Sequence, residues 1–200
     1  MSAPKTDMVL KLLYNAGIVR PSDLKKHGVP REYLPRLHRR GLVERIGRGL
    51  YVLRDAEITE NRSIAEACKK VPQGVICLLS ALRIHGLTTQ LPFEVWMAID
   101  RRARFPKLGH PKLRVVRFSG EALSAGVETR SIEHVSVKVY SIAKTVADCF
   151  KYRNKIGLDV ALEALREALH KRACSVDDLW HYAKICRVSK VIRPYLEAVV

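Results

Sequence analysis

The segment Ile18–Arg54 decides the fold of the N-terminal part of this chain, and its sequence is IVRPSDLKKHGVPREYLPRLHRRGLVERIGRGLYVLR. Proline, serine and aspartate favour helix starts, glycine favours helix ends, and short apolar runs around a glycine-rich turn indicate paired strands. These signals predict two helices and then two strands, at Pro21–His27, Val29–Arg40, Leu42–Ile46 and Leu50–Leu53. A first helix is expected at Thr6–Asn15. Three helices followed by a hairpin are the plan of a winged helix-turn-helix.

The third helix of this plan is predicted to have a basic outward face. Leu34 and Leu37 are three residues apart, so they share the buried face. At about 100° per residue, the opposite face carries Glu32, Pro35, Arg36 and Arg39, with Arg40 beside them. Arginine can bind guanine bidentately in the DNA major groove. Pro35 lacks an amide proton, so either the helix starts nearer Glu32 or it is kinked.

The residues expected to contact DNA lie on the second and third helices and on the hairpin: Lys25, Lys26, Arg31, Tyr33, Arg36, Arg39, Arg40, Arg45 and Arg48. The net charge of the chain is +16, and residues 1–54 hold twelve Lys and Arg against four Asp and Glu, which gives +8. About a quarter of the length therefore carries half of the excess charge, as a basic docking domain would. The alternatives are a solvated basic helix that binds nothing and a charge that only aids solubility.

The rest of the chain is predicted to form a second domain. The polar stretch Asp55–Asn61 is interpreted as a linker, which places the domains at residues 1–56 and 57–200. Helices are expected at Arg62–Lys70, Val75–His85, Ile142–Tyr152, Leu158–His170, Ser175–Cys186 and from Ser189 onward, with a kink at Pro194. Strands are expected at Phe93–Ile99, Leu113–Phe118, Val127–Ile132 and Val135–Tyr140. The predicted fold class is α+β, an N-terminal winged helix-turn-helix followed by a mixed α/β domain with a small sheet and several helices.

A second group of basic residues surrounds one predicted strand of this domain: Arg101, Arg102, Arg104, Lys107, Lys112, Arg114 and Arg117. One interpretation is a further phosphate-binding surface, for an operator or for an RNA. The other is a solvated loop and sheet edge that its charge protects from aggregation. The sequence leaves both open.

Catalytic and metal-binding patterns are not predicted. His170, Cys174, His181 and Cys186 are close in sequence, but their spacing fits no zinc-binding pattern, so no metal and no cofactor are expected. A nuclease needs converging carboxylates, and the region around Glu94 and Asp100 has too few. Ser80 lacks a G-x-S-x-G context, so we expect Ser80 and His85 to form hydrogen bonds within or beside an apolar helix, and Asp148 to form a structural salt bridge.

Cysteine usage and the N-terminus predict a cytoplasmic protein. The five cysteines are odd in number and show no CxxC spacing, which favours reduced thiols. The N-terminus has no apolar signal-peptide core, and the longest apolar stretch, Val75–Leu79, is too short to span a bilayer. No membrane association is expected.

Three strings of the sequence carry a resemblance to a known family: GRGLYVL, GVICLLSALRIHGLTTQLPFEVWMAI and VKVYSIAKTVADCFKYRNKIGLDVALEALREAL. They resemble the AbiEi antitoxin family, bacterial transcriptional regulators of type IV toxin–antitoxin and phage abortive-infection systems. The most specific parts are Leu79–Leu82 with His85–Leu87, and Thr145–Asp148 with Arg153–Gly157. The resemblance extends over nearly the whole chain.

This resemblance implies a non-enzymatic protein with two roles. The N-terminal domain would repress its own operon by binding an inverted repeat in double-stranded DNA. The C-terminal domain would oppose an AbiEii-like nucleotidyltransferase toxin without a stable complex. The alternatives from the residues alone are a nuclease with a winged-helix targeting domain and an adaptor for an acidic protein. The absent carboxylate cluster argues against the nuclease, and arginines on both the third helix and the wing argue against the adaptor.

Overall fold

The computed structural model describes residues 3–56, 61–106 and 108–199. Contacts divide the chain into two compact units, Met1–Lys70 with Ser131–Ser136, and Val71–Arg130 with Val137–Val200. The predicted domain boundary between residues 56 and 57 therefore falls within the first unit, beside the undescribed residues 57–60. Within the described ranges, no helix is both long enough and apolar enough to cross a membrane.

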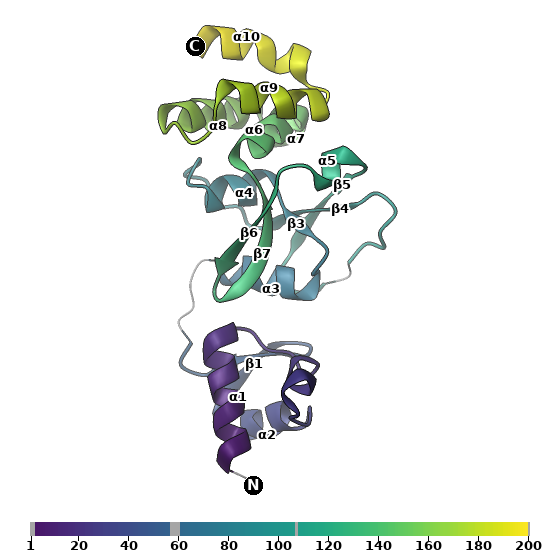
Figure 1. The fold of residues 1–200 in the computed structure, drawn as a ribbon, viewed down its shortest axis with the longest axis vertical. Helices are drawn as coiled ribbons and strands as arrows, with labels where there is room; N and C mark the ends of the chain where they lie inside the picture. The colour runs from purple at the N-terminus through teal and green to yellow at the C-terminus, as the bar shows by residue number, and fades with distance from the viewer. Residues whose placement is uncertain (1–2, 57–60, 107, 200) are drawn as a thin grey trace. The chain divides into compact units, whose positions relative to one another are not determined.

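The N-terminal elements follow the predicted order (Figure 1). They are α1 (Ala3–Ala16), the 3₁₀ helix η1 (Asp23–His27), α2 (Tyr33–Arg39), β1 (Val43–Gly47) and β2 (Leu50–Leu53). The strands pair antiparallel, and Gly49 turns the chain between them with a φ of 69°. Val19 adds an antiparallel bridge to Tyr51, which extends the hairpin by a third short segment. These elements form the winged helix-turn-helix that the sequence predicts.

The second helix differs from the prediction in type, because it is a 3₁₀ helix. It is five residues long, and 3₁₀ geometry is used in such short pieces. Gly28 ends it in the left-handed conformation, and its N–H donates to carbonyl oxygens of Leu24 and Lys25. The tight turn carries Lys25 and Lys26 to the surface while Leu24 is buried.

Pro35 is accommodated without a break because α2 begins at Tyr33. Pro35 is then the third residue of the helix, where a backbone N–H has no partner within the helix in any case. The first α-helical bond runs from the Arg36 N–H to the Glu32 carbonyl, at 3.1 Å. Of the two predicted alternatives, the start nearer Glu32 is confirmed.

The larger sheet has the order β5-β4-β3-β7-β6, and all of it except Ser131–Ser136 belongs to the second unit. Its strands are β3 (Val75–Ile76), β4 (Val95–Asp100), β5 (Leu113–Phe118), β6 (Val127–Ile132) and β7 (Val135–Tyr140). β3 is antiparallel to β4 and parallel to β7, whereas β4 and β5 are parallel. Glu133 and His134 join β6 to β7 with positive φ angles of 52° and 58°, as a type I′ hairpin turn requires.

The predicted helix at Val75–His85 is wrong in its first part. Val75 and Ile76 form the central strand β3, and α4 (Leu78–Ile84) follows after Cys77. A short apolar run cannot be assigned to strand or buried helix by periodicity alone. Here the β-branched pair is completely enclosed, because β4 and β7 bond to both of its edges.

The helices after α2 are α3 (Arg62–Lys70), α4, α5 (Glu121–Ser124), α6 (Ile142–Lys151), α7 (Arg153–Ile156), α8 (Leu158–His170), α9 (Val176–Ile185) and α10 (Ser189–Val199). The last helices of the chain gather on one side of the larger sheet, where α6 lies nearer to the strands than α9 and α10 do (Figure 1). The single-turn helices α5 and α7 were not predicted. α9 begins with a capping box, since Ser175 Oγ accepts from the Asp178 N–H at 3.0 Å and the Ser175 N–H donates to Asp178 Oδ2 at 3.1 Å.

Candidate nucleic-acid interface

The outward face of α2 is the centre of the candidate interface. Leu34 and Leu37 are completely buried, as predicted. They pack in the core of the winged helix with Val9, Leu13, Val19, Leu24, Val29, Tyr33, Val43 and Tyr51. Each buried leucine side chain contributes about 1.5–3 kcal/mol to the stability of the fold, so the helix is held in one orientation. Pro35, Arg36 and Arg39 are exposed on the opposite side.

Tyr33 supports this face instead of forming part of it. Its side chain is 8% exposed and belongs to the core of the winged helix. The guanidinium of Arg36 lies over its ring, with the carbon atom 5.8 Å from the ring centroid. A cation held over an aromatic ring loses little further freedom when it binds a base. We therefore assign Tyr33 to positioning Arg36, where the sequence predicted a direct contact.

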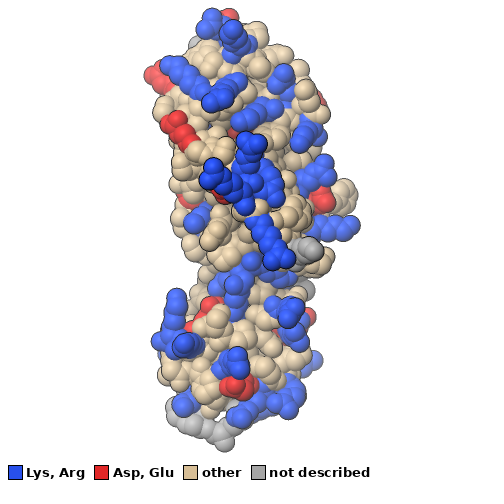
Figure 2. Space-filling view, turned by 90° about the vertical axis from the view of Figure 1, so that its right-hand side faces the viewer, with Lys and Arg blue, Asp and Glu red and all other residues tan. Residues whose placement is uncertain are grey.

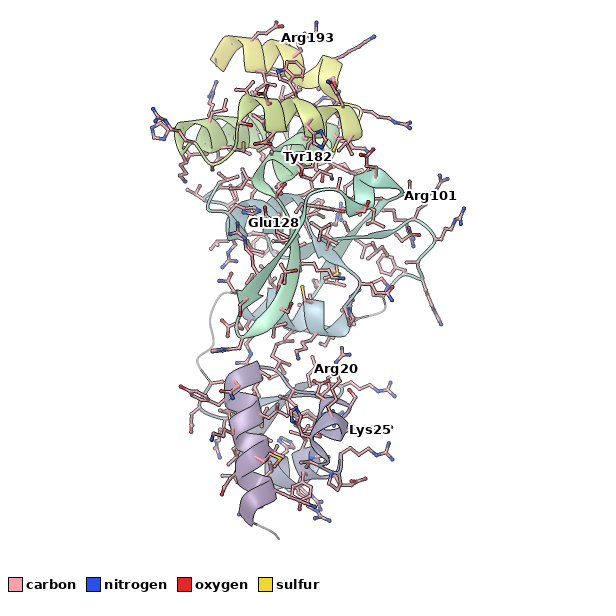
Figure 3. The ribbon with its side chains drawn as sticks, viewed as in Figure 1. Arg20, Lys25, Arg101, Glu128, Tyr182 and Arg193 are labelled. Atoms are coloured by element: carbon pink, nitrogen blue, oxygen red, sulfur yellow. The ribbon has the colours of Figure 1, made fainter. Side chains whose placement is uncertain are left out.

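The remaining predicted contacts are exposed around α2. Lys25 and Lys26 lie on η1, and Figure 3 shows Lys25 directed away from the ribbon. The carboxylate of Asp23 accepts a hydrogen bond from the Arg20 N–H at 2.9 Å and so fixes the start of η1. Arg31 is exposed and lies 3.5 Å from Glu32, a pair that solvent screens strongly.

The wing carries two further arginines. Arg48 is exposed in the turn between β1 and β2. Arg45 is also exposed, and its Nε donates to the Gly47 carbonyl at 3.3 Å, which steadies the strand end. Both side chains belong to the element that contacts the DNA backbone in winged-helix proteins.

The second basic cluster gathers at the β4–β5 connection of the other unit. Figure 2 shows Lys and Arg side chains concentrated on the face that carries this connection, with little acidic surface between them. Arg101, Arg102, Arg104, Lys112 and Arg114 are exposed. Lys107 lies outside the described residues. Figure 3 shows Arg101 extending from the ribbon.

Arg117 has a different role from the other members of the cluster. Its Nη1 donates to three backbone carbonyls, those of Asp100, Arg101 and Ala103, at 3.3, 2.7 and 2.9 Å. The Asp100 carboxylate also accepts from the Arg102 N–H at 2.7 Å. Arg117 therefore holds the loop that presents Arg101 and Arg102, and its guanidinium is partly committed before any ligand binds.

Ser80 and His85 form the structural hydrogen bonds that the sequence predicts. Ser80 Oγ accepts from the Trp96 N–H at 2.9 Å and joins α4 to β4. His85 Nε2 lies 2.7 Å from the Tyr140 carbonyl. Because a carbonyl only accepts, this nitrogen carries the proton. Burial lowers the pKa of His85, which keeps the imidazole neutral.

Asp148 forms the predicted salt bridge, and its partner is Lys144 on the same helix. Lys144 Nζ lies 2.6 Å from Asp148 Oδ2, and both side chains are fully buried. Asp148 Oδ1 also accepts from Cys186 Sγ at 3.2 Å. Burial raises the pKa of Cys186 to about 12, as it does for Cys68, so these thiols stay protonated and are poor nucleophiles.

The four His and Cys residues considered for a metal do not converge. Cys186 is buried against Asp148, whereas His170 and His181 are exposed. Among the described residues, no group of three His, Cys, Asp or Glu side chains is arranged to hold a metal ion.

The structure also assembles a pocket that the sequence analysis missed. Trp96, Phe105 and Tyr152 come from β4, the β4–β5 loop and the segment between α6 and α7, and they line one cavity with Arg114 and Lys155. No local pattern links these positions, because they are far apart in sequence and meet only in the folded unit.

Comparisons with known proteins bear on the winged helix first. The model of a family whose description is "Transcriptional regulator, AbiEi antitoxin" matches residues 7–54. Residues 7–54 are therefore similar to the AbiEi antitoxin regulators. The matched segment contains η1, α2 and the wing, and therefore every predicted DNA contact of the first unit. The comparison with curated proteins gave no match.

A solved structure is similar in fold to nearly all of this chain. It is the crystal structure of the RV2827C protein from Mycobacterium tuberculosis, with a TM-score of 0.60 and 15% sequence identity. The match covers 96% of this chain and 78% of the other. At this identity the likeness concerns the fold alone.

Proposed function

We propose that this protein is a sequence-specific, DNA-binding autorepressor and the antitoxin of a type IV toxin–antitoxin system. The observation that carries the proposal is the exposed Arg36 and Arg39 face of α2, within the segment that matches the AbiEi regulators. Arginine on the outward face of a recognition helix can read guanine while lysines on η1 and arginines on the wing contact phosphates. The DNA site would be an inverted repeat upstream of the protein's own gene.

The division of labour follows the predicted domains, residues 1–56 and 57–200. The first would bind DNA, and the second would oppose a nucleotidyltransferase-like toxin in the cytoplasm, without catalysis and without a stable complex. The basic cluster at the β4–β5 connection supports this second role. A cationic surface can compete for a nucleic acid or nucleotide that the toxin requires, since such contacts need charge more than precise geometry.

Charge reversal in the basic cluster is expected to separate the two roles. Cells expressing the toxin should be rescued by the natural protein but not by the Arg101→Glu, Arg102→Glu, Arg104→Glu triple variant. Repression of a reporter placed behind the protein's own upstream region should stay unchanged, because the winged helix is intact. The measurements are colony counts under toxin induction and reporter activity, with expression checked.

The matched control is the Arg166→Glu, Lys184→Glu, Lys190→Glu triple variant. Its three residues are exposed on the C-terminal helices, and its net charge changes by the same amount. This control should rescue as well as the natural protein does. Full rescue by the Arg101, Arg102, Arg104 variant would refute the charge mechanism. If the natural protein does not repress a reporter placed behind its own upstream region, autorepression is refuted.

A further inference from the structure

The pocket beside β5 combines aromatic walls with cations at its rim. It has a volume of about 370 Å³ and is lined by Trp96, Phe105, Arg114, Val115, Val116, Arg117, Tyr152 and Lys155. Small-ligand sites span roughly 300–1,000 Å³, so this pocket has room for one flat group of modest size. All of the lining residues belong to the second unit.

The cations of the pocket are stacked on its aromatic rings. The guanidinium carbon of Arg114 lies 5.6 Å from the centroid of the Trp96 ring, and Lys155 Nζ lies 5.6 Å from the centroid of the Tyr152 ring. Arg114 also approaches Glu94, but at 3.9 Å and with its side chain 57% exposed, this pair is weak. Positive charge is therefore fixed immediately beside the apolar walls.

Phe105 is the accessible wall of the pocket. It is 52% exposed, although large apolar side chains are normally buried. Its loop is held by Arg117, whose Nη1 donates to the carbonyls of Arg101 and Ala103. Tyr152 forms a further, half-buried part of the wall, and burial raises the pKa of its hydroxyl to about 12, so the ring is uncharged at neutral pH.

We propose that this pocket binds an unpaired base of single-stranded nucleic acid, with Phe105 stacking on the base and Arg114 and Lys155 contacting the flanking phosphates. A stacked aromatic beside cations suits a flat, electron-rich ring attached to an anion. A paired base is buried in its helix and cannot enter a pocket, so the ligand must be unpaired. Arg101, Arg102 and Arg104 extend the positive surface beyond the pocket, which suits a strand of several nucleotides over a single nucleotide.

This site is independent of the proposed duplex DNA binding, because it uses none of the residues of the winged helix. The test uses the full-length protein and fluorescence anisotropy of a labelled single-stranded oligouridine of about twelve nucleotides. Phe105→Ala should weaken binding roughly 5- to 150-fold, the range that base–aromatic stacking supplies. Phe93→Ala is the matched control, since Phe93 is fully exposed and lies outside the pocket, and it should change affinity by less than about twofold.

A second readout places the base in the pocket. Trp96 and Trp180 are the two tryptophans of the chain, so a Trp180→Phe variant leaves Trp96 as the single reporter. Oligouridine should change the fluorescence of Trp96 in this variant, and after Phe105→Ala is added the change should need roughly 5- to 150-fold more oligouridine. Arg36→Ala should leave both measurements unaltered, which separates this site from the DNA-binding face.

Titrations with other ligands define what the pocket binds and which results overturn the proposal. RNA and DNA oligomers of the same sequence show which strand is preferred, and either preference supports a single-strand site. Equal losses from Phe105→Ala and Phe93→Ala would overturn the proposal, as would a duplex that competes as well as the single strand. Uridine monophosphate or polyglutamate binding as tightly as the oligomer would overturn it as well, and would indicate a nucleotide pocket or a site for an acidic protein.

Discussion

Replacing Arg36 with alanine is expected to lower the affinity for the protein's own operator roughly 5- to 150-fold, because one bidentate base contact is worth about 1–3 kcal/mol. Arg36 is exposed on α2 and its guanidinium is held over the Tyr33 ring. The affinity for random duplex DNA should fall far less, because the specific base contact of Arg36 is not formed on random DNA. Anisotropy titrations with both duplexes at the same salt concentration measure the two effects.

Lys25→Ala is the matched control for Arg36→Ala. Lys25 is exposed on η1, where we propose that it contacts phosphates, so its removal should weaken operator and random DNA alike. If Arg36→Ala behaves as Lys25→Ala does, then Arg36 contacts only the backbone and α2 does not read the sequence in the way proposed. A conservative Arg36→Lys change should retain backbone affinity but lose bidentate readout.

Asp148→Ala is expected to reduce the free energy of unfolding by about 3–5 kcal/mol, the usual effect of leaving a buried charge without its partner. Lys144 would then remain in the core with a fully buried ammonium group, close to the rings of Tyr140 and Phe118. Lys144 Nζ lies 4.1 Å from the centroid of the Tyr140 ring and 4.8 Å from the centroid of the Phe118 ring, and these rings attract the cation without neutralising its charge. Urea denaturation of the natural and variant proteins measures the difference.

Two comparisons separate charge burial from simple loss of contacts. Replacing both partners, with Lys144→Met and Asp148→Leu, should restore most of the lost stability, because an apolar pair of similar size removes the uncompensated charge. Glu167→Ala breaks the exposed Lys171–Glu167 pair, in which Lys171 Nζ lies 3.0 Å from Glu167 Oε2, and it should reduce the free energy of unfolding far less than Asp148→Ala does. A double variant less stable than Asp148→Ala would mean that the ion pair itself, and not relief of a buried charge, stabilises this core.

The winged helix could be predicted from the sequence because its signals are local. Gly28 and Gly49 mark turns, and the spacing of Leu34 and Leu37 sets the buried face of α2. The position of Pro35 was ambiguous only because the start of a helix depends on its cap, and helix boundaries are weakly encoded. The 3₁₀ geometry of η1 likewise depends on how Leu24 reaches the core and not on periodicity.

Features made by distant parts of the chain could not be predicted in the same way. Val75 and Ile76 form a strand because two other strands enclose them, which a run of five apolar residues does not reveal. The partner of Asp148 on its own helix follows from i,i+4 spacing, but its complete burial depends on the surrounding elements, and Cys186 is 38 residues away in sequence. The pocket of Trp96, Phe105 and Tyr152 has no sequence signal, because three separate segments contribute one ring each.

The central claim is that α2 reads a specific DNA sequence, and the ratio of two affinities tests it most directly. The full-length protein is titrated, at about 150 mM salt, against a duplex carrying its own upstream region and against a random duplex of equal length. The proposal predicts that the upstream duplex binds at least about a thousandfold more tightly, the lower end of the range for specific DNA-binding proteins. Equal affinities for the two duplexes would contradict it and would leave the arginine face of α2 as a non-specific basic surface.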